Sequence, residues 1–600
     1  MNAPLIQKDD SHSVSSTNHI VQPSLWPELG VSTVEKCYFR LSGPVGYSLT
    51  NQELSFQVGG KVKTNTYYNL FNVGKWAEFC GNVPISLFLS GNGRFQINVF
   101  AIREHESVEK IFSDAVELDG EHFFDVNAEI FNHPRTILYF QLIALTEGKI
   151  EDFGWSTAAA PRQTPELTIS ITTFKREEAV TKTIDRFREF FQETEISKHL
   201  DLVVVDNGQT LDLEDEEKIQ IIKNENLGGA GGFSRGLLEA TSKGASHCLF
   251  MDDDASIQMG SITRTWWFLA YALDSRTAVS GAMIDGAFRN KIWENGALFN
   301  GGCRPLFHKT DLKDLEELLE MEFETGYQAS PDFYGGWWFF AFPIAHAKHL
   351  PFPFFVRGDD VSFSLANDFK HITLPGVASI QESFSGKASP LTWYLDLRSH
   401  LAHHLSLDAK QDSWRTVRKM LFSFYFRTIV RFHYDSISAA SLAIEDVLKG
   451  PGFFAENADM AQRRSDIKQL TKTEAWEKLD HKIVARYGKC PRPIRAILLL
   501  TLNGHLIPFS RFFGSELAVE AYKRENFREI YGARKITYLN SHKTEAYTVT
   551  RDHRRFWQET WRFIKNARAL KRSYGKSQND YRTLYGHLTS NEFWKEKLNY

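Results

Sequence analysis

Residues 167–254 alternate between short apolar runs and helix-like stretches, and this alternation constrains the fold more than any other feature of the chain. LTISITTF at Leu167–Phe174 is followed by an amphipathic segment at 177–195, and then by DLVVVDNG at Asp201–Gly208. A glycine-rich turn and a second helix-like stretch lead to the run HCLFMDDD. Strand–helix–strand order of this kind predicts a parallel sheet with helices on both faces.

Polar side chains follow these runs at the points where the strands should end. Arg176 comes after the first run, Asp206 after the second, and the triplet Asp252, Asp253 and Asp254 after the last. Ligands of parallel sheets bind at the carboxyl ends of the strands. Adjacent carboxylates repel one another unless a cation or a proton offsets their charge. Asp252 and Asp254 could both reach one Mg²⁺ or Mn²⁺ ion while Asp253 points elsewhere; the alternative is a solvated polar loop.

The segment NENLGGAGGFSRG at Asn224–Gly236 is a glycine-rich turn that leads into a helix. Glycine allows backbone N–H groups to approach a phosphate closely, and a helix start favours an anion. The segment lacks the Gly-Lys-Ser/Thr of a Walker A loop and the G-x-G-x-x-G pattern of dinucleotide-binding proteins. By itself it is equally well interpreted as a flexible turn.

A second acidic pair, Asp359 and Asp360, follows an apolar run and precedes a helix-like stretch. One of the two carboxylates could act as a general base toward an acceptor hydroxyl. The alternative is that both are acids in the first turn of a helix, where they are common. Trp337 and Trp338 could form a platform on which a sugar stacks, although neighbouring residues of a strand face opposite sides, so that one of them is expected in the core.

The 600 residues are too many for one core, and the chain divides by pattern into several parts. We expect a disordered N-terminus at 1–25, a β-sandwich at 26–156, an α/β domain at 165–404 and a helical domain at 405–600. The sandwich rests on short alternating strands without a helix of normal length. The predicted fold class is therefore multidomain α/β, with an N-terminal β-sandwich, a central mixed α/β domain and a C-terminal helical region.

Composition excludes some classes of protein and favours a compartment. The net charge of −4 gives no basic footprint for nucleic acid. The five cysteines lie far apart without a C-x-x-C pair, which argues against a disulfide framework or zinc site and favours the cytosol. The polar N-terminus has no apolar stretch of the kind found in signal peptides. AILLLTLNGHLIPF at Ala496–Phe509 is too short and interrupted to cross a bilayer, so we expect a core helix, with docking at a membrane surface as the alternative.

Six motifs, taken in order, resemble those of family 2 nucleotide-sugar glycosyltransferases, which have the two-layered GT-A fold. The resemblance is stronger to the bacterial galactofuranosyltransferases that polymerise cell-wall galactan. The motifs are TTFKR (Thr172–Arg176), VVDNG (Val204–Gly208), NLGGAGGFSRG (Asn226–Gly236), FMDDD (Phe250–Asp254), GGWWF (Gly335–Phe339) and GDD (Gly358–Asp360). Weaker similarity in both terminal regions extends the resemblance over most of the chain.

The resemblance implies an inverting, metal-dependent transfer of galactofuranose from UDP-galactofuranose to a hydroxyl of a growing cell-surface glycan. It implies that Asp252 and Asp254 bind Mn²⁺ or Mg²⁺ and that Asp360 is the catalytic base. Four positions correspond to donor-binding residues, namely Arg176, Asp206, Asn226 and Asp253. Three correspond to acceptor-binding residues, namely Trp337, Trp338 and Asp359.

The sequence also departs from the pattern of these enzymes. Gln381 stands where a metal-binding His is expected, which leaves the Gln381 amide oxygen, Glu382 or water as the third ligand. Gly358 replaces an acceptor-site Trp, and Asp396 stands near the position of another expected His. The changes cluster on the acceptor side, so the linkage and the acceptor can differ from those of galactan polymerisation.

Two other functions remain open at this point. An aspartyl phosphatase could use Asp252 and Asp254 as its D-x-D motif, although its nucleophile usually follows a domain's first strand. A non-catalytic glycan-binding protein could retain the fold without turnover. For the transferase we expect a UDP-sugar and a glycan acceptor attached to a lipid as partners, with no nucleic acid and with a homo-oligomer as an open alternative. We expect a cytoplasmic protein whose basic, aromatic C-terminal helices dock peripherally at the inner face of the plasma membrane.

Overall fold

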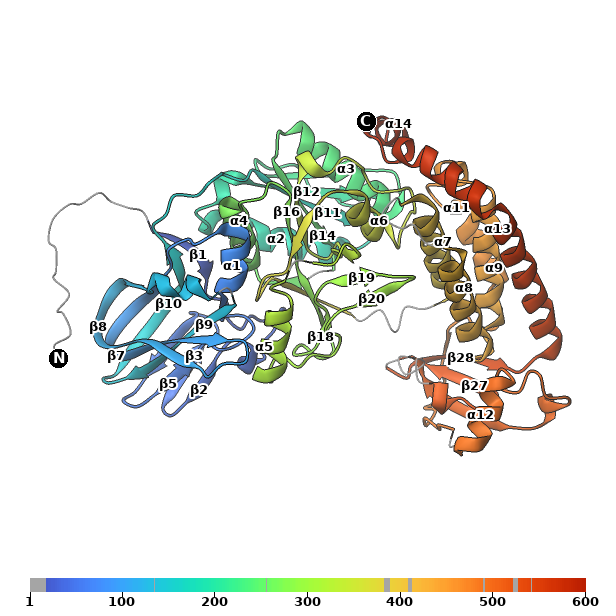
Figure 1. Ribbon diagram of the computed structural model, residues 1–600, viewed down its shortest axis with the longest axis horizontal. Coiled ribbons are helices and arrows are strands. Elements are labelled where there is room, and N and C mark those ends of the chain that lie inside the picture. The colour runs from blue at the N-terminus through green and yellow to red at the C-terminus, as the bar shows by residue number, and fades with distance from the viewer. Residues whose placement is uncertain are drawn as a thin grey trace.

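The computed structural model describes residues 18–600 apart from 134, 255, 328, 383–388, 408–412, 489–490, 522–526 and 541. A β-rich N-terminal region, a central α/β region and a helical C-terminal region follow one another along the long axis of the molecule (Figure 1). The mixed α/β class with C-terminal helices is therefore as predicted, while the domain boundaries stay predictions. Within the stretch expected to be disordered, His19–Pro23 forms strand β1; residues 1–17 lie outside the described residues.

The N-terminal region is one antiparallel sheet of ten strands, in the order β2-β5-β9-β7-β10-β4-β3, with β1 on β10, β6 on β9 and β8 on β7. Besides β1, the strands are β2 Arg40–Ser42, β3 Val45–Ser48, β4 Glu53–Phe56, β5 Lys61–Lys63, β6 Phe71–Asn72, β7 Ser86–Arg103, β8 Glu109–Asp125, β9 Thr136–Ala144 and β10 Gly148–Thr157. Helix α1, Val73–Cys80, was not expected from the sequence.

The predicted β-sandwich of two separate sheets is not confirmed, because the long strand β7 belongs to both halves. Its first part pairs with β10 and its second part pairs with β9. Gly91 allows the close approach near the change of partner, since a Cβ there would lie 2.2 Å from the Lys149 carbonyl oxygen. The region is thus mainly β structure, formed by one continuous sheet together with helix α1.

The central region is built on a seven-stranded sheet in the order β13-β12-β11-β14-β22-β16-β23. Strands β11 Leu167–Thr173, β12 Leu200–Asp206, β13 Ile219–Lys223 and β14 His247–Asp252 run parallel, as the sequence predicts. Strand β22, Phe340–Pro343, runs antiparallel to β14 and to β16, Thr277–Ser280, so the whole sheet is mixed. The remaining elements of this sheet and its helices are β23 Lys370–Ile372, α2 Glu177–Glu193, α3 Gly228–Ser242 and α4 Gly260–Tyr271.

Two small sheets and two helices complete the central region beside the carboxyl ends of these strands. One sheet has the order β15-β24-β17-β18 and the other β20-β19-β21. Their strands are β15 Ser256–Ile257, β17 Ala282–Asp285, β18 Ile292–Glu294, β19 Ala297–Phe299, β20 Cys303–Pro305, β21 Phe333–Tyr334 and β24 Ala378–Gln381. The helices are α5 Leu315–Glu324 and α6 Asp359–Ala366.

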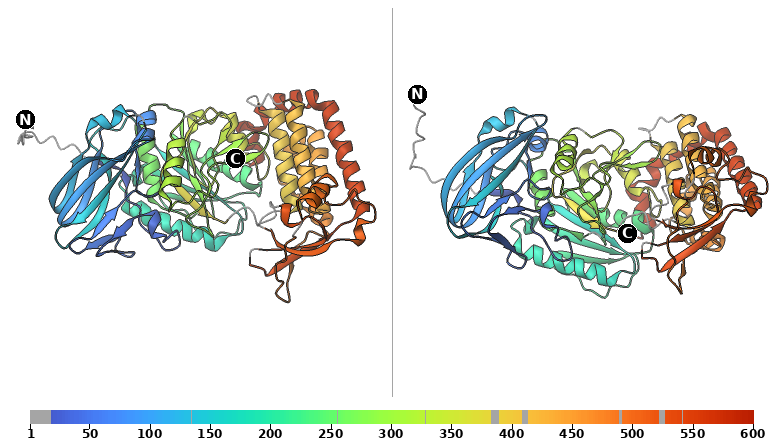
Figure 2. Two further views of the ribbon diagram at one scale, coloured as in Figure 1. Left: turned by 60° about the horizontal axis from the view of Figure 1, so that its bottom comes forward. Right: turned by 90° about the horizontal axis from the view of Figure 1, so that it is seen from below.

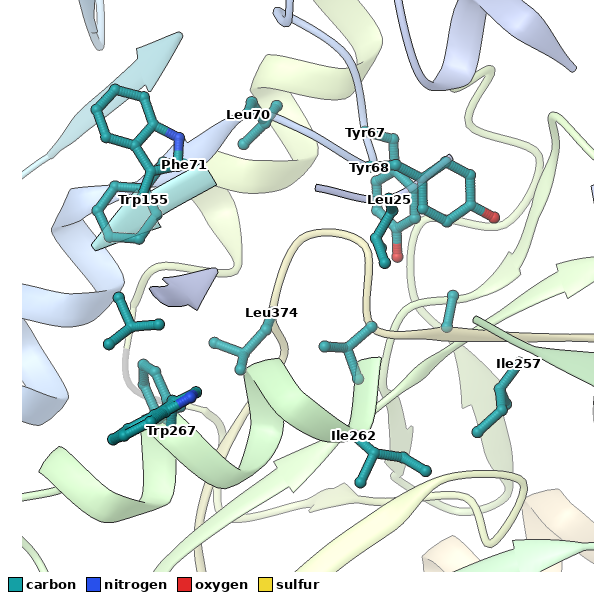
Figure 3. Close-up of a cluster of buried hydrophobic side chains, with 14 of the residues drawn as sticks. Leu25, Tyr67, Tyr68, Leu70, Phe71, Trp155, Ile257, Ile262, Trp267 and Leu374 are labelled. Carbon is teal, nitrogen blue, oxygen red and sulfur yellow. The ribbon is translucent and has the colours of Figure 1, made fainter. Parts of the chain in front are cut away.

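One buried core joins the N-terminal and central regions (Figure 3). The labelled side chains are Leu25, Tyr67, Tyr68, Leu70, Phe71 and Trp155 from the first region and Ile257, Ile262, Trp267 and Leu374 from the second. A buried ion pair reinforces the junction, with Lys75 Nζ of α1 2.7 Å from Glu322 Oε2 of α5. Removing one partner of such a pair leaves an uncompensated buried charge, which is strongly destabilising.

Among the residues that the structure describes, the C-terminal region contains the eight α-helices α7 to α14 and a sheet that was not predicted. The helices are α7 Pro390–Ser406, α8 Trp414–Ile429, α9 Tyr434–Leu448, α10 Gly452–Glu456, α11 Ala461–Leu470, α12 Arg492–Leu500, α13 His553–Leu588 and α14 Asn591–Lys597. A four-stranded sheet in the order β25-β28-β27-β26 lies at one end of the long helices (Figures 1 and 2). Its strands are β25 Glu477–Lys478, β26 Ser515–Glu520, β27 Ala533–Leu539 and β28 Glu545–Thr550.

The expectation of a core helix at 496–509 is wrong. Among the nine described residues of α12, Leu498 alone is buried, and Leu500 is 78% exposed. The pattern misled because α12 lies on the outside of the small C-terminal sheet rather than between layers (Figure 1). In the part of the chain that the structure describes, no helix is both long enough and apolar enough to cross a membrane.

Candidate active site

The carboxyl ends of the parallel strands bring the predicted acidic residues to one edge of the central sheet. In the register of the sheet Thr173 stands opposite Asp206, and Thr172 stands opposite Asp252. Each of these strands is an apolar run that ends in a polar residue at the carboxyl edge of the sheet, which is why the sequence pattern located the edge correctly.

Asp252 is the most perturbed member of the triplet. Its pKa is raised to about 7, mainly by burial and then by the nearby carboxylates of Asp254, Asp253 and Asp360. The side chain of Gln381 at the end of β24 faces Asp252 and acts in the opposite direction on this pKa. Gln381 therefore lies beside the carboxylate that the sequence pointed to, and Glu382 next to it is exposed.

Arg176 supplies positive charge to the other two aspartates. Its Nη1 lies 3.0 Å from Asp253 Oδ1 and 2.8 Å from Asp254 Oδ2. Asp253 also accepts a hydrogen bond of 2.8 Å from the Thr173 hydroxyl, so it points away from Asp252, as predicted. The triplet is thus divided into a carboxylate beside Gln381 and two carboxylates that share one guanidinium.

The second acidic pair begins helix α6 and closes the other side of the site. Burial, followed by the charge of Asp360, raises the pKa of Asp359 well above its ordinary value. Burial also raises the pKa of Asp360 to about 6, although backbone N–H groups and the guanidinium of Arg357 lower it. Because Asp252 responds to the charge of Asp360, the two acidic motifs, more than 100 residues apart in sequence, form one electrostatic cluster.

Gly358 caps α6 in a left-handed conformation, with φ of 90°. A Cβ at this position would lie 2.7 Å from Ser399 Cβ and 2.8 Å from His403 Nε2, both on α7. The Trp that the resemblance places here therefore does not fit unless α7 moves. Asp396 of α7, the other departure, pairs with Arg357 at 3.0 Å.

The glycine-rich segment serves close packing in this structure. Gly228 opens α3 with φ of 68°, and a Cβ there would lie 2.1 Å from the Phe355 carbonyl oxygen. A Cβ at Gly236 would lie 1.8 Å from Ser170 Oγ of β11. The glycines thus bring α3 against the sheet and against the loop that leads to Asp359, whose Oδ2 would lie 3.0 Å from a Cβ at Gly229.

Two predicted donor residues shape loops. Asp206 is buried, and its carboxylate accepts hydrogen bonds from the backbone N–H groups of Gly208, Thr210 and Leu211 at 2.7–2.9 Å. Asn226 Oδ1 accepts a hydrogen bond of 3.1 Å from Gly228 N at the start of α3. Both residues lie at the expected edge, and their contact with a donor stays a prediction.

Neither Trp of the predicted stacking platform presents an open face. Trp337 is 5% exposed and packs against Phe233 and Phe250, with ring centroids 4.8 and 5.1 Å away. Trp338 is 6% exposed, and its Nε1 donates a hydrogen bond of 2.9 Å to the Gly281 carbonyl oxygen. The two rings do face opposite sides of the strand, but both sides are buried in the core. The low exposure of the rings therefore does not support the predicted stacking role.

Glu294 is a site residue that sequence reasoning missed. Its pKa is raised to about 8, mainly by burial and then by the charge of Asp360. Its Oε1 has no hydrogen-bond partner among the residues that the structure describes. Burial raises the pKa of Tyr334, and the charges of Glu294 and Asp360 act on it in the same direction. The Tyr334 hydroxyl therefore belongs to the same group of buried polar side chains. The available signal was that Glu294 lies on the same strand face as the buried Ile292 in KIWENG.

The ligands of the cluster fit a hard divalent cation. Asp252, Asp254 and the Gln381 amide offer oxygen ligands, which Mg²⁺ and Mn²⁺ prefer. The raised pKa of Asp252 shows that the present neighbours leave its charge under-compensated. Within the described residues, no group of three or more His, Cys, Asp or Glu side chains is arranged as a complete metal site. A cation here would therefore need ligands from a bound substrate or water as well.

Comparisons with known proteins agree with this geometry. Residues 168–310 match the family described as Glycosyl transferase family 2. The galactofuranosyltransferase GlfT2 of Mycolicibacterium smegmatis is 22% identical over 488 residues, which cover 74% of this chain and 73% of that protein. GlfT2 of Mycobacterium tuberculosis is 24% identical over 445 residues, 66% of this chain and 67% of that one.

Solved structures give only distant similarity. The mannosyltransferase PcManGT of Pyrobaculum calidifontis, in complex with GDP-Man and Mn²⁺, matches 52% of this chain and 85% of its own at 16% identity. The TM-score of this match is 0.29.

Proposed function

We propose that this chain moves galactofuranose from UDP-galactofuranose to a hydroxyl of a growing cell-surface glycan. The proposal is supported by its family 2 glycosyltransferase domain and by its resemblance to galactan-polymerising galactofuranosyltransferases. The transfer inverts the anomeric centre and depends on Mn²⁺ or Mg²⁺. The observation that carries the proposal is the single electrostatic cluster formed by Asp252, Asp254 and Asp360 at the carboxyl edge of the sheet.

The donor side is formed by the aspartate triplet and Arg176. Asp252 and Asp254, with the Gln381 amide, would hold the cation, which when bound supplies positive charge to the diphosphate of the leaving UDP. Arg176 is 46% exposed in its side chain and lies against Asp253 and Asp254, so it can turn from these carboxylates to a diphosphate without leaving the site. Asp206 and Asn226 hold the loops that border the nucleotide.

The acceptor side is formed by the start of α6. With a pKa of about 6, Asp360 is mostly ionised at neutral pH and can accept the proton of the attacking hydroxyl. Asp359, with its raised pKa, would be protonated and could donate a hydrogen bond to a sugar oxygen. The hydroxyl then attacks the anomeric carbon from the face opposite UDP, and positioning contributes much of the acceleration.

Several partners belong to the same proposal. The acceptor is a glycan attached to a lipid, and the protein works in the cytoplasm at the inner face of the plasma membrane. A homo-oligomer is compatible with this setting.

A non-catalytic glycan-binding protein is the second candidate, and the observation that favours it is Gln381. At this position a neutral amide lies beside Asp252, where the expected metal-binding His is absent.

The experiment that tests the proposal is UDP release from UDP-galactofuranose and a short galactofuranosyl acceptor. We expect release that requires acceptor, stops with EDTA and falls at least about 100-fold in Asp254→Asn and in Asp360→Asn. Asp212→Asn, a substitution of an exposed aspartate in the loop after β12, is the matched control and should retain full release. Undiminished release by Asp360→Asn would contradict the role of that residue, and glycan binding without release from any nucleotide sugar would favour the second candidate.

A further inference from the structure

Residues 350–358 lead directly into the acidic pair of α6, and their backbone is strained. Phe355 and Arg357 have φ of 71° and 69°, in the left-handed region that residues other than glycine rarely adopt, and Gly358 follows with φ of 90°. For a residue as bulky as Phe355 this conformation is an outlier. Strained backbone persists only where the surrounding contacts hold it. The contacts of this segment therefore decide where the acidic pair lies.

Two consecutive carbonyl groups of the segment are held by different helices. The Phe354 carbonyl oxygen accepts a hydrogen bond from Arg398 Nη2 of α7. The Phe355 carbonyl oxygen accepts one of 3.1 Å from Ala230 N at the start of α3. Helix α7 lies beside α6 (Figure 1), so the side chain that holds the first carbonyl comes from the element next to the acidic pair.

Arg398 is a buried cation with unusual surroundings. It is 1% exposed, and besides the Phe354 carbonyl its guanidinium contacts Met460 Sδ at 2.8 Å and the rings of Tyr394 and Phe454, whose centroids lie 5.2 and 5.1 Å away. None of these groups is a carboxylate, and Arg398 Nε has no hydrogen-bond partner in the part of the chain that the structure describes. A buried charge is costly under such conditions, and an apolar side chain would pack among these rings at less cost. What the guanidinium adds is its hydrogen bond to the segment.

We propose that Arg398 is a positioning residue for Asp360, because its guanidinium fixes the Phe354 carbonyl and with it the strained segment that places the first turn of α6. Asp360 Oδ1 accepts a hydrogen bond of 2.8 Å from Val361 N, so the direction of this carboxylate follows the backbone of that turn. A displacement of the segment therefore moves the carboxylate away from the attacking hydroxyl. A shift of about 1 Å can cost about 100-fold in rate.

The inference deepens the proposed function and rests on it in one respect, namely that Asp360 is the base. The hold of Arg398 on the segment does not depend on any reaction, so it can be measured without donor or acceptor.

The kinetic test is UDP release by Arg398→Met, which removes the charge and the donors and keeps an apolar side chain. Active sites are counted by UDP binding with Mn²⁺. We expect kcat to fall about 10- to 100-fold and KM for UDP-galactofuranose to change by less than about twofold. Arg398→Lys, which can still donate to the Phe354 carbonyl, should stay within about fivefold of the wild type. In an Asp360→Asn background Arg398→Met should lower kcat no further, because the arginine acts through that carboxylate.

The structural test is hydrogen exchange of the backbone amides of residues 352–361 without substrates. Loss of a charge-assisted hydrogen bond should make them exchange at least about tenfold faster in Arg398→Met. Arg551→Met is the matched control, because Arg551 is also buried and donates to two backbone carbonyls, those of Ser510 and Ala533 beside the C-terminal sheet. It should lower the thermal stability and leave both kcat and the exchange of residues 352–361 unchanged.

Thermal unfolding shows which variants have folded, and Arg398→Gln takes the place of Arg398→Met in all measurements if the latter does not fold. The inference is overturned if the Arg398 variant keeps full kcat, if its effect is undiminished in the Asp360→Asn background, or if Arg551→Met lowers kcat as much. Full release by Asp360→Asn would instead contradict the proposed role of Asp360, whereas unchanged exchange of residues 352–361 would overturn the hold of Arg398 on the segment. The two failures are therefore distinguishable.

Discussion

Substitution of Gly358 by Ala tests how the structure positions the acidic pair of α6. The residue has φ of 90°, a conformation that costs an L-residue about 1–2 kcal/mol. The new Cβ would also lie 2.7 Å from Ser399 Cβ, and overpacking of this kind costs about 1–3 kcal/mol. We therefore expect Gly358→Ala to lower the free energy of unfolding by about 2–5 kcal/mol in total.

Gly450→Ala separates the two contributions. Gly450 has φ of 95°, and nothing lies within 4 Å of a Cβ built on it, so only the backbone cost of about 1–2 kcal/mol remains. Urea unfolding followed by circular dichroism gives both values. UDP release by folded Gly358→Ala should fall about 10- to 100-fold, because Asp359 and Asp360 shift with the first turn of α6. Equal destabilisation by the two variants would refute the close contact between α6 and α7.

Three further predictions concern charges in the site. The acid limb of the pH profile of kcat/KM should lie near pH 6, the pKa of Asp360. Because the guanidinium of Arg357 lowers that pKa, Arg357→Gln should move the limb to higher pH and reduce kcat/KM at pH 6 several-fold. An unchanged limb would exclude Asp360 as the titrating base. Because the folded-state pKa of Glu294 is raised to about 8, its contribution to stability is fully present below about pH 4.5 and is lost as pH rises through 8. In urea unfolding, the free energy of unfolding of Glu294→Gln should therefore exceed that of the wild type by about 1–3 kcal/mol at pH 9 and equal it at pH 4. Without UDP, Arg176→Gln should bind free Mn²⁺ about five- to tenfold more tightly in an electron paramagnetic resonance titration, because Arg176 no longer competes for Asp254; weaker binding would show that Arg176 is not a competing cation.

The sequence located the edge of the sheet well, because apolar runs that end in carboxylates follow a local rule. The parallel strands that end at Asp206 and Asp252 lie where the pattern predicts. The association of Asp360 with Asp252 depends on tertiary packing and came from the family resemblance. Glu294 could not be assigned, since an acid on a short strand is ordinary in sequence and becomes unusual only when its burial is known.

The differences between the sequence predictions and the structure have equally specific causes. The sandwich prediction treated alternating strands as two layers, whereas β7 changes partner along its length and joins them. The core-helix prediction at 496–509 assumed that apolar residues are buried, and α12 exposes them. The sugar-binding role of Trp337 and Trp338 came from the family resemblance and stays a prediction; their packing leaves at most 6% of either residue exposed.

The measurement that tests the proposed reaction most directly is the donor dependence of acceptor-stimulated UDP release. Purified protein would be given UDP-galactofuranose, UDP-galactopyranose or UDP-glucose with Mn²⁺ and a galactofuranosyl acceptor, and the anomeric configuration of the product would be read by nuclear magnetic resonance. We predict release from UDP-galactofuranose alone, with inverted configuration. Preferential release from a pyranose donor, or retained configuration, would contradict the proposal.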